Sequence, residues 1–299
     1  MKVGFVGLGQ MGKHMALNLA SARHQLIVSD IRTDAFPEFQ ERGVKVTTDV
    51  RDVAEADIIF LSLPNGDVLK SALFGPSGMA DCLRPGQIII DTSTITYAAT
   101  VQIAKDLDAR GVIFLDAPVS GMEARAKDAT LTFMCGGSRN TFEAVQPLLA
   151  HMGNKILYMG GAGSGQLTKL INQLLFDINV AALAEILPMA AKMGLDPERV
   201  GEVVNSGTGR SYASEFFIPN ILNGLFSAGY PMRAAYKDLV SGAEISANQG
   251  IPLPVLAAAT ATYQQALLRG HGDKDKGGMI HVFEELLGVQ FRKTSAPTQ

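Results

Sequence analysis

The chain has 299 residues and a mass of 31.8 kDa, with 26 Lys and Arg against 29 Asp and Glu and a formal net charge of −3. A hydrophobic fraction of 47% with 18% charged residues excludes a disordered chain, and the length suits two domains with separate cores. The near balance of charge argues against a nucleic-acid partner, because neutralising phosphates requires a concentrated Lys and Arg surface and no long basic run is present.

The first half of the chain alternates short β-rich runs with helical segments, from residue 1 to about 160. This alternation predicts repeated βαβ units around a largely parallel sheet, which is a doubly wound α/β domain. The predicted strands are Val3–Val6, Gln25–Ser29, Asp57–Leu63, Gln87–Asp91, Ile113–Leu115 and Leu131–Cys135.

A glycine cluster at 160–163 ends the strand signals, and the remainder is rich in helix-forming residues. The longest predicted helix runs over 165–193, where Pro188 is expected to kink it or move its end. We therefore expect domains over 1–162 and 163–293, the second of them all-α, followed by a frayed tail at 294–299. The other predicted helices of the second domain are 197–205, 234–248, 254–269 and 280–287.

Two features bear on membrane association and compartment. The apolar stretch 178–191 is the nearest to a membrane span, but it is short and contains Glu185 and Pro188, so no membrane partner is expected. The first residues lack the apolar segment of a signal peptide, and Cys82 and Cys135 have no metal-ligand spacing. We expect a cytoplasmic protein without a metal site.

The first turn carries the clearest binding motif, Gly7-Leu8-Gly9-Gln10-Met11-Gly12. It is a GxGxxG between a predicted strand and a predicted helix, where glycines permit a tight turn and the helix N-terminus attracts a pyrophosphate. A glycine-rich turn that binds nothing is the alternative for the motif alone. Its position in a βαβ unit predicts a Rossmann-type domain, with these six residues holding a dinucleotide.

Asp30 supports the dinucleotide interpretation because it ends the second strand, about 20 residues after the motif, where a carboxylate accepts hydrogen bonds from an adenosine ribose. This favours NAD. Arg32, two residues later, provides the alternative, since a guanidinium there accommodates the 2′-phosphate of NADP unless it is only a solvated loop charge.

Several motifs along the chain resemble the β-hydroxyacid dehydrogenase family, which includes 3-hydroxyisobutyrate dehydrogenase and tartronate semialdehyde reductase. The resemblance begins with the extended cofactor signature at residues 7–19 and covers most of the chain. The further blocks are Leu63-Pro64-Asn65, Asp91-Thr92-Ser93-Thr94, Asp116-Ala117-Pro118-Val119-Ser120-Gly121, Gly163-x-Gly165-x-x-x-Lys169-x-x-Asn172 and Lys237-Asp238-Leu239.

The resemblance implies the remaining cofactor contacts. Leu63, Pro64 and Asn65 are expected to run past the middle of the cofactor, and Thr94 to contact its nicotinamide end. Lys237 is expected on the nicotinamide side, where a second cation favours a carboxylated substrate. The alternative interpretation of Lys237 is a surface charge. The alternative for the other segments is a plain turn at the end of a strand.

Lys169 is the predicted catalytic residue. Oxidising an alcohol requires a base for the hydroxyl proton and a cation for the developing alkoxide, and a lysine withdrawn from water can fill both roles. The alternative, a solvated lysine on a helix face, is opposed by its apolar helix and by the family match. Asn172 lies three residues later on the same face, where it can orient the ammonium or hold the substrate oxygen.

Ser120 and Gly121 are expected to bind a substrate carboxylate, since they follow a strand at the carboxyl edge of the sheet. Met122 and Gln173 depart from the family pattern, which has a second glycine and a second asparagine at these positions. Met122 fills space beside the expected carboxylate, so the substrate can differ from those of well-known members. Arg210 is either an exposed loop charge or a contact for a second acidic group.

These observations predict an NAD-preferring dehydrogenase, with NADP as the alternative, that interconverts a short β-hydroxyacid and its semialdehyde. The rivals are an imine reductase of the same architecture, which usually lacks the lysine, and a binding module without turnover. The helix over 165–193 is apolar on more than one face and therefore needs cover, which predicts a homodimer or homotetramer.

Overall fold

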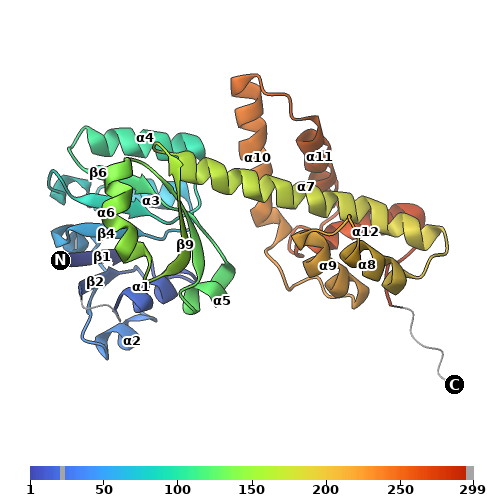
Figure 1. Cartoon of the computed structure of the whole chain (residues 1–299), viewed down its shortest axis with the longest axis horizontal. Coiled ribbons are helices and arrows are strands. Elements are labelled where there is room, and N and C mark those ends of the chain that lie inside the picture. The colour runs from blue at the N-terminus through green and yellow to red at the C-terminus, as the bar shows by residue number, and fades with distance from the viewer. Residues whose placement is uncertain (21–23, 294–299) are drawn as a thin grey trace. The chain divides into compact units, whose positions relative to one another are not determined.

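The computed structural model describes residues 1–20 and 24–293 and forms two compact units, Met1–Lys169 and a second from Leu170 onward (Figure 1). The division falls inside a single helix, α7 (Ser164–Lys192), whose first turns belong to the first unit. The expected tail 294–299 lies outside the described residues. Each unit has its own buried core.

The first unit is built on a nine-stranded sheet in the order β3-β2-β1-β4-β5-β6-β8-β7, with β9 beside β8. Neighbours from β3 to β6 pair in parallel, whereas β8 runs antiparallel to β6 and β7. This order confirms the predicted doubly wound sheet. The strands are β1 Lys2–Val6, β2 Gln25–Ser29, β3 Lys45–Thr47, β4 Ile58–Leu61, β5 Ile88–Asp91, β6 Ile113–Asp116, β7 Val119–Ser120, β8 Leu131–Gly136 and β9 Gly153–Gly160.

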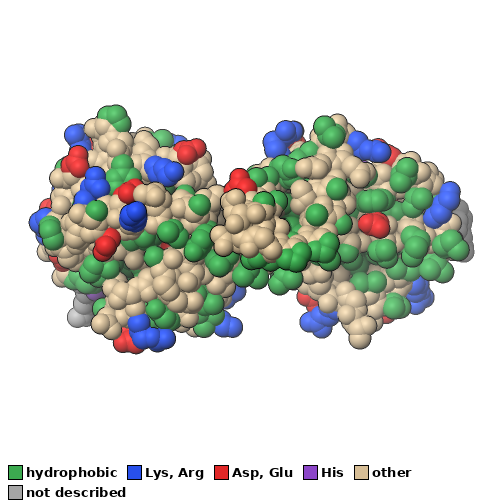
Figure 2. Space-filling view, turned by 90° about the horizontal axis from the view of Figure 1, so that it is seen from above, with side chains coloured by type: hydrophobic (Ala, Val, Ile, Leu, Met, Phe, Trp, Pro, Cys, Tyr) green, Lys and Arg blue, Asp and Glu red, His purple; other side chains and the backbone are tan. Residues whose placement is uncertain are grey.

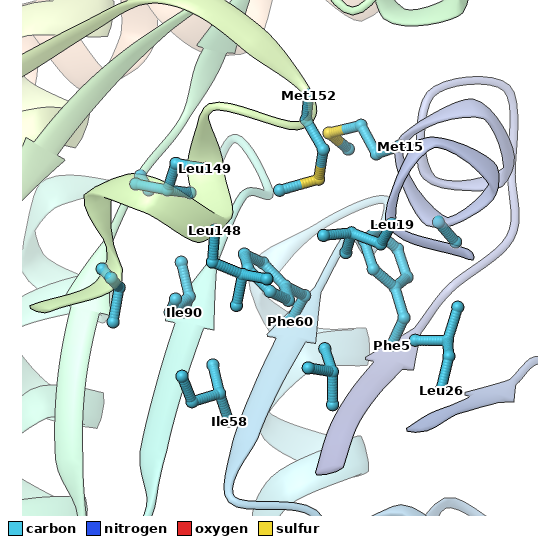
Figure 3. Packing of buried hydrophobic residues seen from close by; sticks show 14 of the residues in the cluster. Phe5, Met15, Leu19, Leu26, Ile58, Phe60, Ile90, Leu148, Leu149 and Met152 are labelled. Atoms are coloured by element: carbon cyan, nitrogen blue, oxygen red, sulfur yellow. The ribbon is translucent and has the colours of Figure 1, made fainter. Parts of the chain in front are cut away.

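Helices cover both faces of this sheet, because alternate side chains of a strand enter two separate cores. In β4, Phe60 joins the core beneath α1 and α6, whereas Ile59 joins the core beneath α3 and α4. Figure 3 shows the first of these cores, where the Phe5 and Phe60 rings stack at 5.8 Å. The helices are α1 Gly12–Ala20, α2 Phe36–Gln40, α3 Gly66–Phe74, α4 Tyr97–Asp108, α5 Met122–Lys127 and α6 Arg139–Leu149, with short 3-10 turns η1 Val50–Glu55 and η2 Ala80–Cys82.

The second unit is helical throughout its described part, as predicted, and α7 continues past Pro188 without a break. One helix, α9, was not predicted from the sequence, where Pro219 obscures it. Ser211 and Ser214 form a capping box that starts α9 in the structure. The remaining elements are α8 Pro197–Ser206, α9 Tyr212–Leu222, α10 Met232–Gln249, α11 Pro254–Leu268, η3 Lys276–Met279 and α12 Ile280–Leu287.

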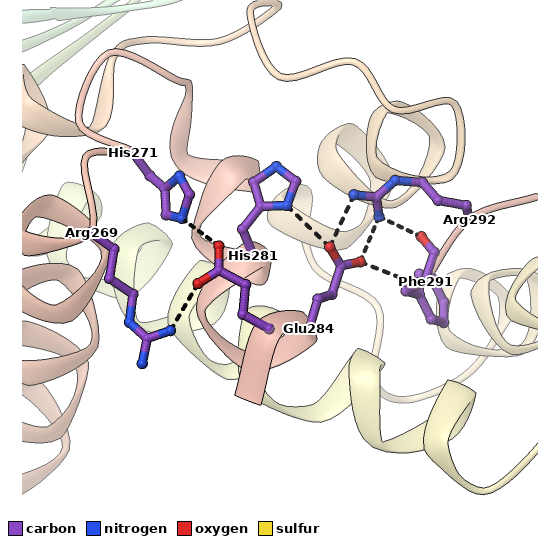
Figure 4. A network of polar contacts seen from close by, with 7 residues as sticks. Arg269, His271, His281, Glu284, Phe291 and Arg292 are labelled. Carbon is purple, nitrogen blue, oxygen red and sulfur yellow. Dashed lines mark hydrogen bonds and ion pairs between the residues drawn. The ribbon is translucent and has the colours of Figure 1, made fainter. Parts of the chain in front are cut away.

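Glu284 on α12 fastens the last described residues to this unit (Figure 4). Its carboxylate accepts hydrogen bonds from both terminal nitrogens of Arg292, at 2.6 and 3.0 Å, and from the backbone N–H of Phe291 at 2.8 Å. Phe291 is fully buried as a result. The chain that follows α12 therefore contributes to the helical core.

Helix α7 is long and apolar enough to cross a membrane by length and composition, and a third (33%) of its most apolar window is buried within the chain. The apolar stretch considered in the sequence was shorter than the helix that forms. Core helices of soluble proteins meet the same criterion, and α7 carries the fully buried Asp177 in an ion pair with Lys276. The feature alone is weak evidence for a membrane.

Candidate cofactor and substrate site

The glycine turn between β1 and α1 fits a dinucleotide. Gly7 has φ +95°, and a Cβ there would lie 2.2 Å from the Ser62 carbonyl oxygen. A Cβ on Gly12 would lie 2.0 Å from the Gly7 carbonyl oxygen, so both glycines are required by the turn itself. Gly9 differs, because a Cβ there meets nothing within 4 Å. Open space in front of Gly9 at a helix N-terminus is what a pyrophosphate requires.

Asp30 lies next to this turn at the end of β2. Its carboxylate accepts a hydrogen bond from the Leu8 N–H at 2.6 Å and another from the Arg32 N–H at 2.8 Å. A carboxylate has about four acceptor positions, so capacity remains for ribose hydroxyls. A cavity of about 150 Å³ adjoins the pair and is lined by Leu8, Lys13, Asp30, Arg32, Asp34 and Ala35.

The predicted segment at Leu63, Pro64 and Asn65 follows β4 on the same sheet edge. The Leu63 N–H donates to the Ser93 hydroxyl at 2.8 Å, which joins it to the loop that follows β5. Asn65 caps α3, since its side-chain oxygen accepts from the Val68 N–H at 2.9 Å. Asn65 thus has a structural role that sequence analysis did not assign, and Pro64 is exposed.

Two buried carboxylates end neighbouring strands, Asp91 on β5 and Asp116 on β6, which are paired in register. Burial raises the pKa of Asp91 to about 7 and that of Asp116 to about 6. Asp116 accepts hydrogen bonds from the Gly163 N–H at 2.7 Å and the Gln166 N–H at 2.9 Å. It therefore anchors the start of α7, the helix that carries Lys169.

The predicted substrate segment forms a short strand rather than a plain turn, because Val119–Ser120 pairs antiparallel with β8. Gly121 then adopts φ +143° and Met122 adopts φ +59°. Met122 and Ala129 are the two non-glycine residues with positive φ in the described part of the chain; Met122 is the first residue of α5, and Ala129 follows the C-cap of this helix. A bulky residue in this conformation is strained. The Met122 side chain is 58% exposed.

Glu123, which follows Met122, links the substrate segment to the glycine turn. Its carboxylate accepts a hydrogen bond from the Gln10 amide at 2.8 Å and contacts His14 Nε2 at 3.2 Å. A third partner, Lys127, lies at 2.8 Å. Bonds from Lys127, Gln10 and His14 lower the pKa of Glu123 to about 2, so the link is charged at neutral pH.

Lys169 is half-buried in the second turn of α7, and Asn172 lies three residues later, exposed, with its amide nitrogen 3.4 Å from the Gln173 side-chain oxygen. Thr94 is half-buried after β5 in the same unit as Lys169. Lys237, exposed on α10, belongs to the helical unit, as does Arg210, whose Nε lies 2.7 Å from Glu215. The first unit alone brings together the glycine turn, Asp30, Thr94 and the substrate segment.

Sequence reasoning gave no role to Asp91, Asp116 or Gln166. Asp91 and Asp116 belong to motifs in which other residues were predicted to bind the cofactor or the substrate. Gln166 lies at one of the variable positions of the motif that contains Lys169. A buried-polar pattern, with acids at the ends of apolar strands, was the available signal for Asp91 and Asp116. No sequence signal indicated that Gln166 contacts the loop after β5.

Comparison with known proteins decides the family. Residues 2–160 match the NAD binding domain of 6-phosphogluconate dehydrogenase, and residues 163–283 match the NAD-binding domain of NADP-dependent 3-hydroxyisobutyrate dehydrogenase. The chain is 36% identical to 2-(hydroxymethyl)glutarate dehydrogenase of Eubacterium barkeri, over 97% of both chains. It belongs to the β-hydroxyacid dehydrogenase family. As a member, it is an NAD(P)-dependent oxidoreductase that acts on hydroxyl groups.

Other relatives of this dehydrogenase agree. Human mitochondrial 3-hydroxyisobutyrate dehydrogenase is 34% identical over 95% of this chain and 87% of its own length. The 2-hydroxy-3-oxopropionate reductase of Escherichia coli is 35% identical, covering 95% of this chain and 97% of that one. A Mycobacterium tuberculosis 3-hydroxyisobutyrate dehydrogenase solved with L-serine superposes with a TM-score of 0.83 at 31% identity, over 94% of this chain and 98% of that one.

Imine reductases share the architecture only. The enzyme from Myxococcus stipitatus superposes with a TM-score of 0.62 at 17% identity, covering 94% of this chain and 98% of that one. This likeness establishes a common fold and no common reaction. The dehydrogenase interpretation is therefore retained over the imine reductase alternative.

Proposed function

We propose that this dehydrogenase prefers NAD and interconverts a short acid of the form HOCH2–CH(R)–COO⁻ with its semialdehyde. The observation that carries the proposal is the carbon frame shared by the compounds in the names of its relatives. 3-Hydroxyisobutyrate has R = methyl, 2-(hydroxymethyl)glutarate has R = CH2CH2COO⁻, and reduction of 2-hydroxy-3-oxopropionate gives the acid with R = hydroxyl. L-serine, bound to the mycobacterial enzyme, has the same frame with R = ammonium.

Each of the predicted site residues has a separate role in this proposal. The glycine turn and Asp30 would hold NAD, which would supply the hydride acceptor for the carbinol carbon. Lys169 takes the hydroxyl proton and balances the developing alkoxide charge, and Asn172 orients the same oxygen. The Ser120 hydroxyl and the Gly121 N–H bind the carboxylate. Met122, strained and exposed at a position where the family pattern has glycine, borders the R group and restricts which substrates fit.

The preference for NAD over NADP rests on the cavity beside Asp30. Asp30 and Asp34 both line it, and Glu38 holds the nearby Lys13 ammonium at 2.7 Å. Two carboxylates repel a 2′-phosphate, whereas a ribose hydroxyl donates to them. Among the cations that line this cavity, Arg32 is the one without an ion pair in the described contacts. Its guanidinium would attract a 2′-phosphate and so favours NADP.

Lys237 is proposed to add positive charge near the nicotinamide and the substrate carboxylate.

The protein is further proposed to be cytoplasmic, an expectation supported by its free cysteines, of which Cys82 is exposed. A homodimer or homotetramer is proposed from the uncovered apolar side chains of α7. Hydrophobic side chains gather on the face of the helical unit seen in Figure 2. The large hydrophobic residues of α7 that are exposed in the described chain are Ile171, Leu175, Ile186 and Met189.

A substrate panel tests the reaction. Purified protein is assayed for NADH formation with 3-hydroxyisobutyrate, glycerate, 2-(hydroxymethyl)glutarate and L-serine. Isobutanol is the matched control, because it replaces the carboxylate of 3-hydroxyisobutyrate by a methyl group. We expect at least one acid to be oxidised and isobutanol to be inert. No turnover with any acid, or equal kcat/KM for isobutanol, contradicts the proposal.

A further inference from the structure

The Gln166 side chain bridges the backbone on both sides of Thr94. Its amide nitrogen donates to the Ser93 carbonyl oxygen at 2.6 Å, and its amide oxygen accepts from the Ile95 N–H at 3.3 Å. The side chain is 2% exposed. Both ends of one buried amide are therefore used to fix the peptide groups that flank Thr94.

Gln166 is itself fixed by the sheet. Its backbone N–H donates to Asp116, and that carboxylate also holds Gly163. Gly165 packs so closely here that a Cβ would lie 2.2 Å from the Met134 carbonyl oxygen. The first turn of α7 thus has little freedom to shift against the ends of β6 and β8.

Lys169 follows Gln166 by three residues on the same helix, so the two share one side of α7. Without Gln166, a shift of the first turn of α7 would move Lys169 while the Thr94 loop stayed in place. All of these residues belong to the first unit. Gln166 is therefore placed to hold a fixed separation between the loop and the base.

We propose that Gln166 is a positioning residue that sets the nicotinamide-contacting Thr94 loop against Lys169 for hydride and proton transfer, an inference that rests on the proposed function. Hydride transfer requires donor and acceptor carbons in near contact, and a misplacement of about 1 Å costs about a hundredfold in rate. Loss of the amide should consequently lower turnover more than binding.

Gln87 offers a matched control in the same unit. It is also a buried glutamine, 5% exposed, and its amide nitrogen donates to the Ala54 carbonyl at 2.8 Å and to the Ala56 carbonyl. Its oxygen accepts from the Arg84 N–H. It precedes β5, however, whereas the Thr94 loop follows that strand, so Gln87 lies at the opposite edge of the sheet. Gln87→Ala removes the same kind of bond away from the site.

The test compares Gln166→Ala, Gln166→Glu and Gln87→Ala. We expect Gln166→Ala to lower kcat by about tenfold or more, with little change in KM for the acid, and to raise the primary deuterium isotope effect on kcat. Gln166→Glu keeps the acceptor for Ile95 and should recover part of the loss. Gln87→Ala should lower the melting temperature comparably and leave kcat within about threefold.

Binding separates this inference from the proposed reaction. Gln166→Ala should weaken NAD while leaving ADP-ribose, which lacks nicotinamide, bound as in the wild type. Equal weakening of both ligands, or equal kcat losses in Gln166→Ala and Gln87→Ala, overturns the positioning role. If the wild type oxidises none of the acids, the proposed reaction fails, and the comparison of NAD with ADP-ribose still decides whether Gln166 positions the nicotinamide end.

Discussion

Single side chains carry the proposed chemistry, and Lys169 carries most of it. It is half-buried one turn beyond the Asp116 anchor of α7, which holds the backbone at the start of this helix. Asp30 has the corresponding importance for the cofactor.

Lys169→Ala should abolish turnover by several orders of magnitude and leave the Kd for NAD nearly unchanged, because the side chain acts mainly in the transition state. Steady-state kinetics and a fluorescence titration with NADH measure the two effects. Lys192→Ala, near the other end of α7, is the control and should retain wild-type kcat. A Lys169→Ala variant with more than about a tenth of the wild-type kcat, a loss below roughly 1.4 kcal/mol, excludes the acid–base role.

Asp30→Ser should lower kcat/KM for NAD by about tenfold, since a charged acceptor for the ribose hydroxyls is lost, and should raise the NADP-to-NAD ratio. Both cofactors are assayed at one fixed acid concentration. Asp34→Ser, in the same cavity, is the matched control that removes an acid without removing the bonds to Leu8 and Arg32. A wild type that already prefers NADP would show that Arg32 sets the preference.

Among the helices and strands, those with a strong apolar pattern were predictable. All six expected strands form, and β4, which is buried on both faces, reads as a continuous apolar run. Three strands, β3, β7 and β9, were not predicted. Strands β3 and β7 have three and two residues and are half-buried at best, and β9, although it has eight residues, is exposed or half-buried throughout except at Gly153. Their pairing is set by neighbouring strands rather than by their own composition. In the site, likewise, the glycine turn could be predicted from a short sequence motif. The contacts of Gln166 could not, because they join segments that are far apart in the sequence.

The paired ends of β5 and β6 should make stability fall as pH rises. Asp91 titrates near pH 7 when folded and near 3.8 when unfolded, so its contribution is complete below pH 3.8 and is lost through about pH 7. Asp91→Asn keeps the acceptor for the Ser93 N–H and cannot ionise. We expect the wild type to lose roughly 2 kcal/mol relative to Asp91→Asn between pH 5 and 8, measured by urea unfolding. Parallel profiles for the two proteins contradict this.

The contact between α7 and η3 contains a buried ion pair, Lys276 with Asp177, and Tyr263 donates to the same carboxylate at 2.9 Å. Lys276→Met should lower the free energy of unfolding by about 3–5 kcal/mol, because it leaves Asp177 charged and unpaired. The double variant Asp177→Asn/Lys276→Met removes the charge, keeps an acceptor for Tyr263 and should recover most of the loss. Urea unfolding measures both, and a loss below about 1 kcal/mol in Lys276→Met contradicts the expectation.

For the protein as a whole, the distribution of apolar surface is the feature that a single chain does not explain. The first unit buries both faces of its sheet under its own helices. The helical unit instead leaves apolar side chains of α7 more than half exposed, among them Leu175 at 60% and Ile186 at 52%. Exposed apolar surface of this kind is more typical of an interface than of the surface of a monomer.

The protein should therefore be an oligomer in solution. A helix that is apolar nearly all round needs cover on nearly all sides, and a second copy supplies the same apolar face in return. Light scattering at micromolar concentration should give the mass of a dimer or tetramer. Leu175→Asp should shift the mass toward the monomer, whereas Leu268→Asp, at an 89% exposed position on α11, should not. A wild-type mass near 31.8 kDa refutes the oligomer. Recovery of the chain with membranes instead would assign the face of α7 to lipid, which the criterion of length and composition also permits.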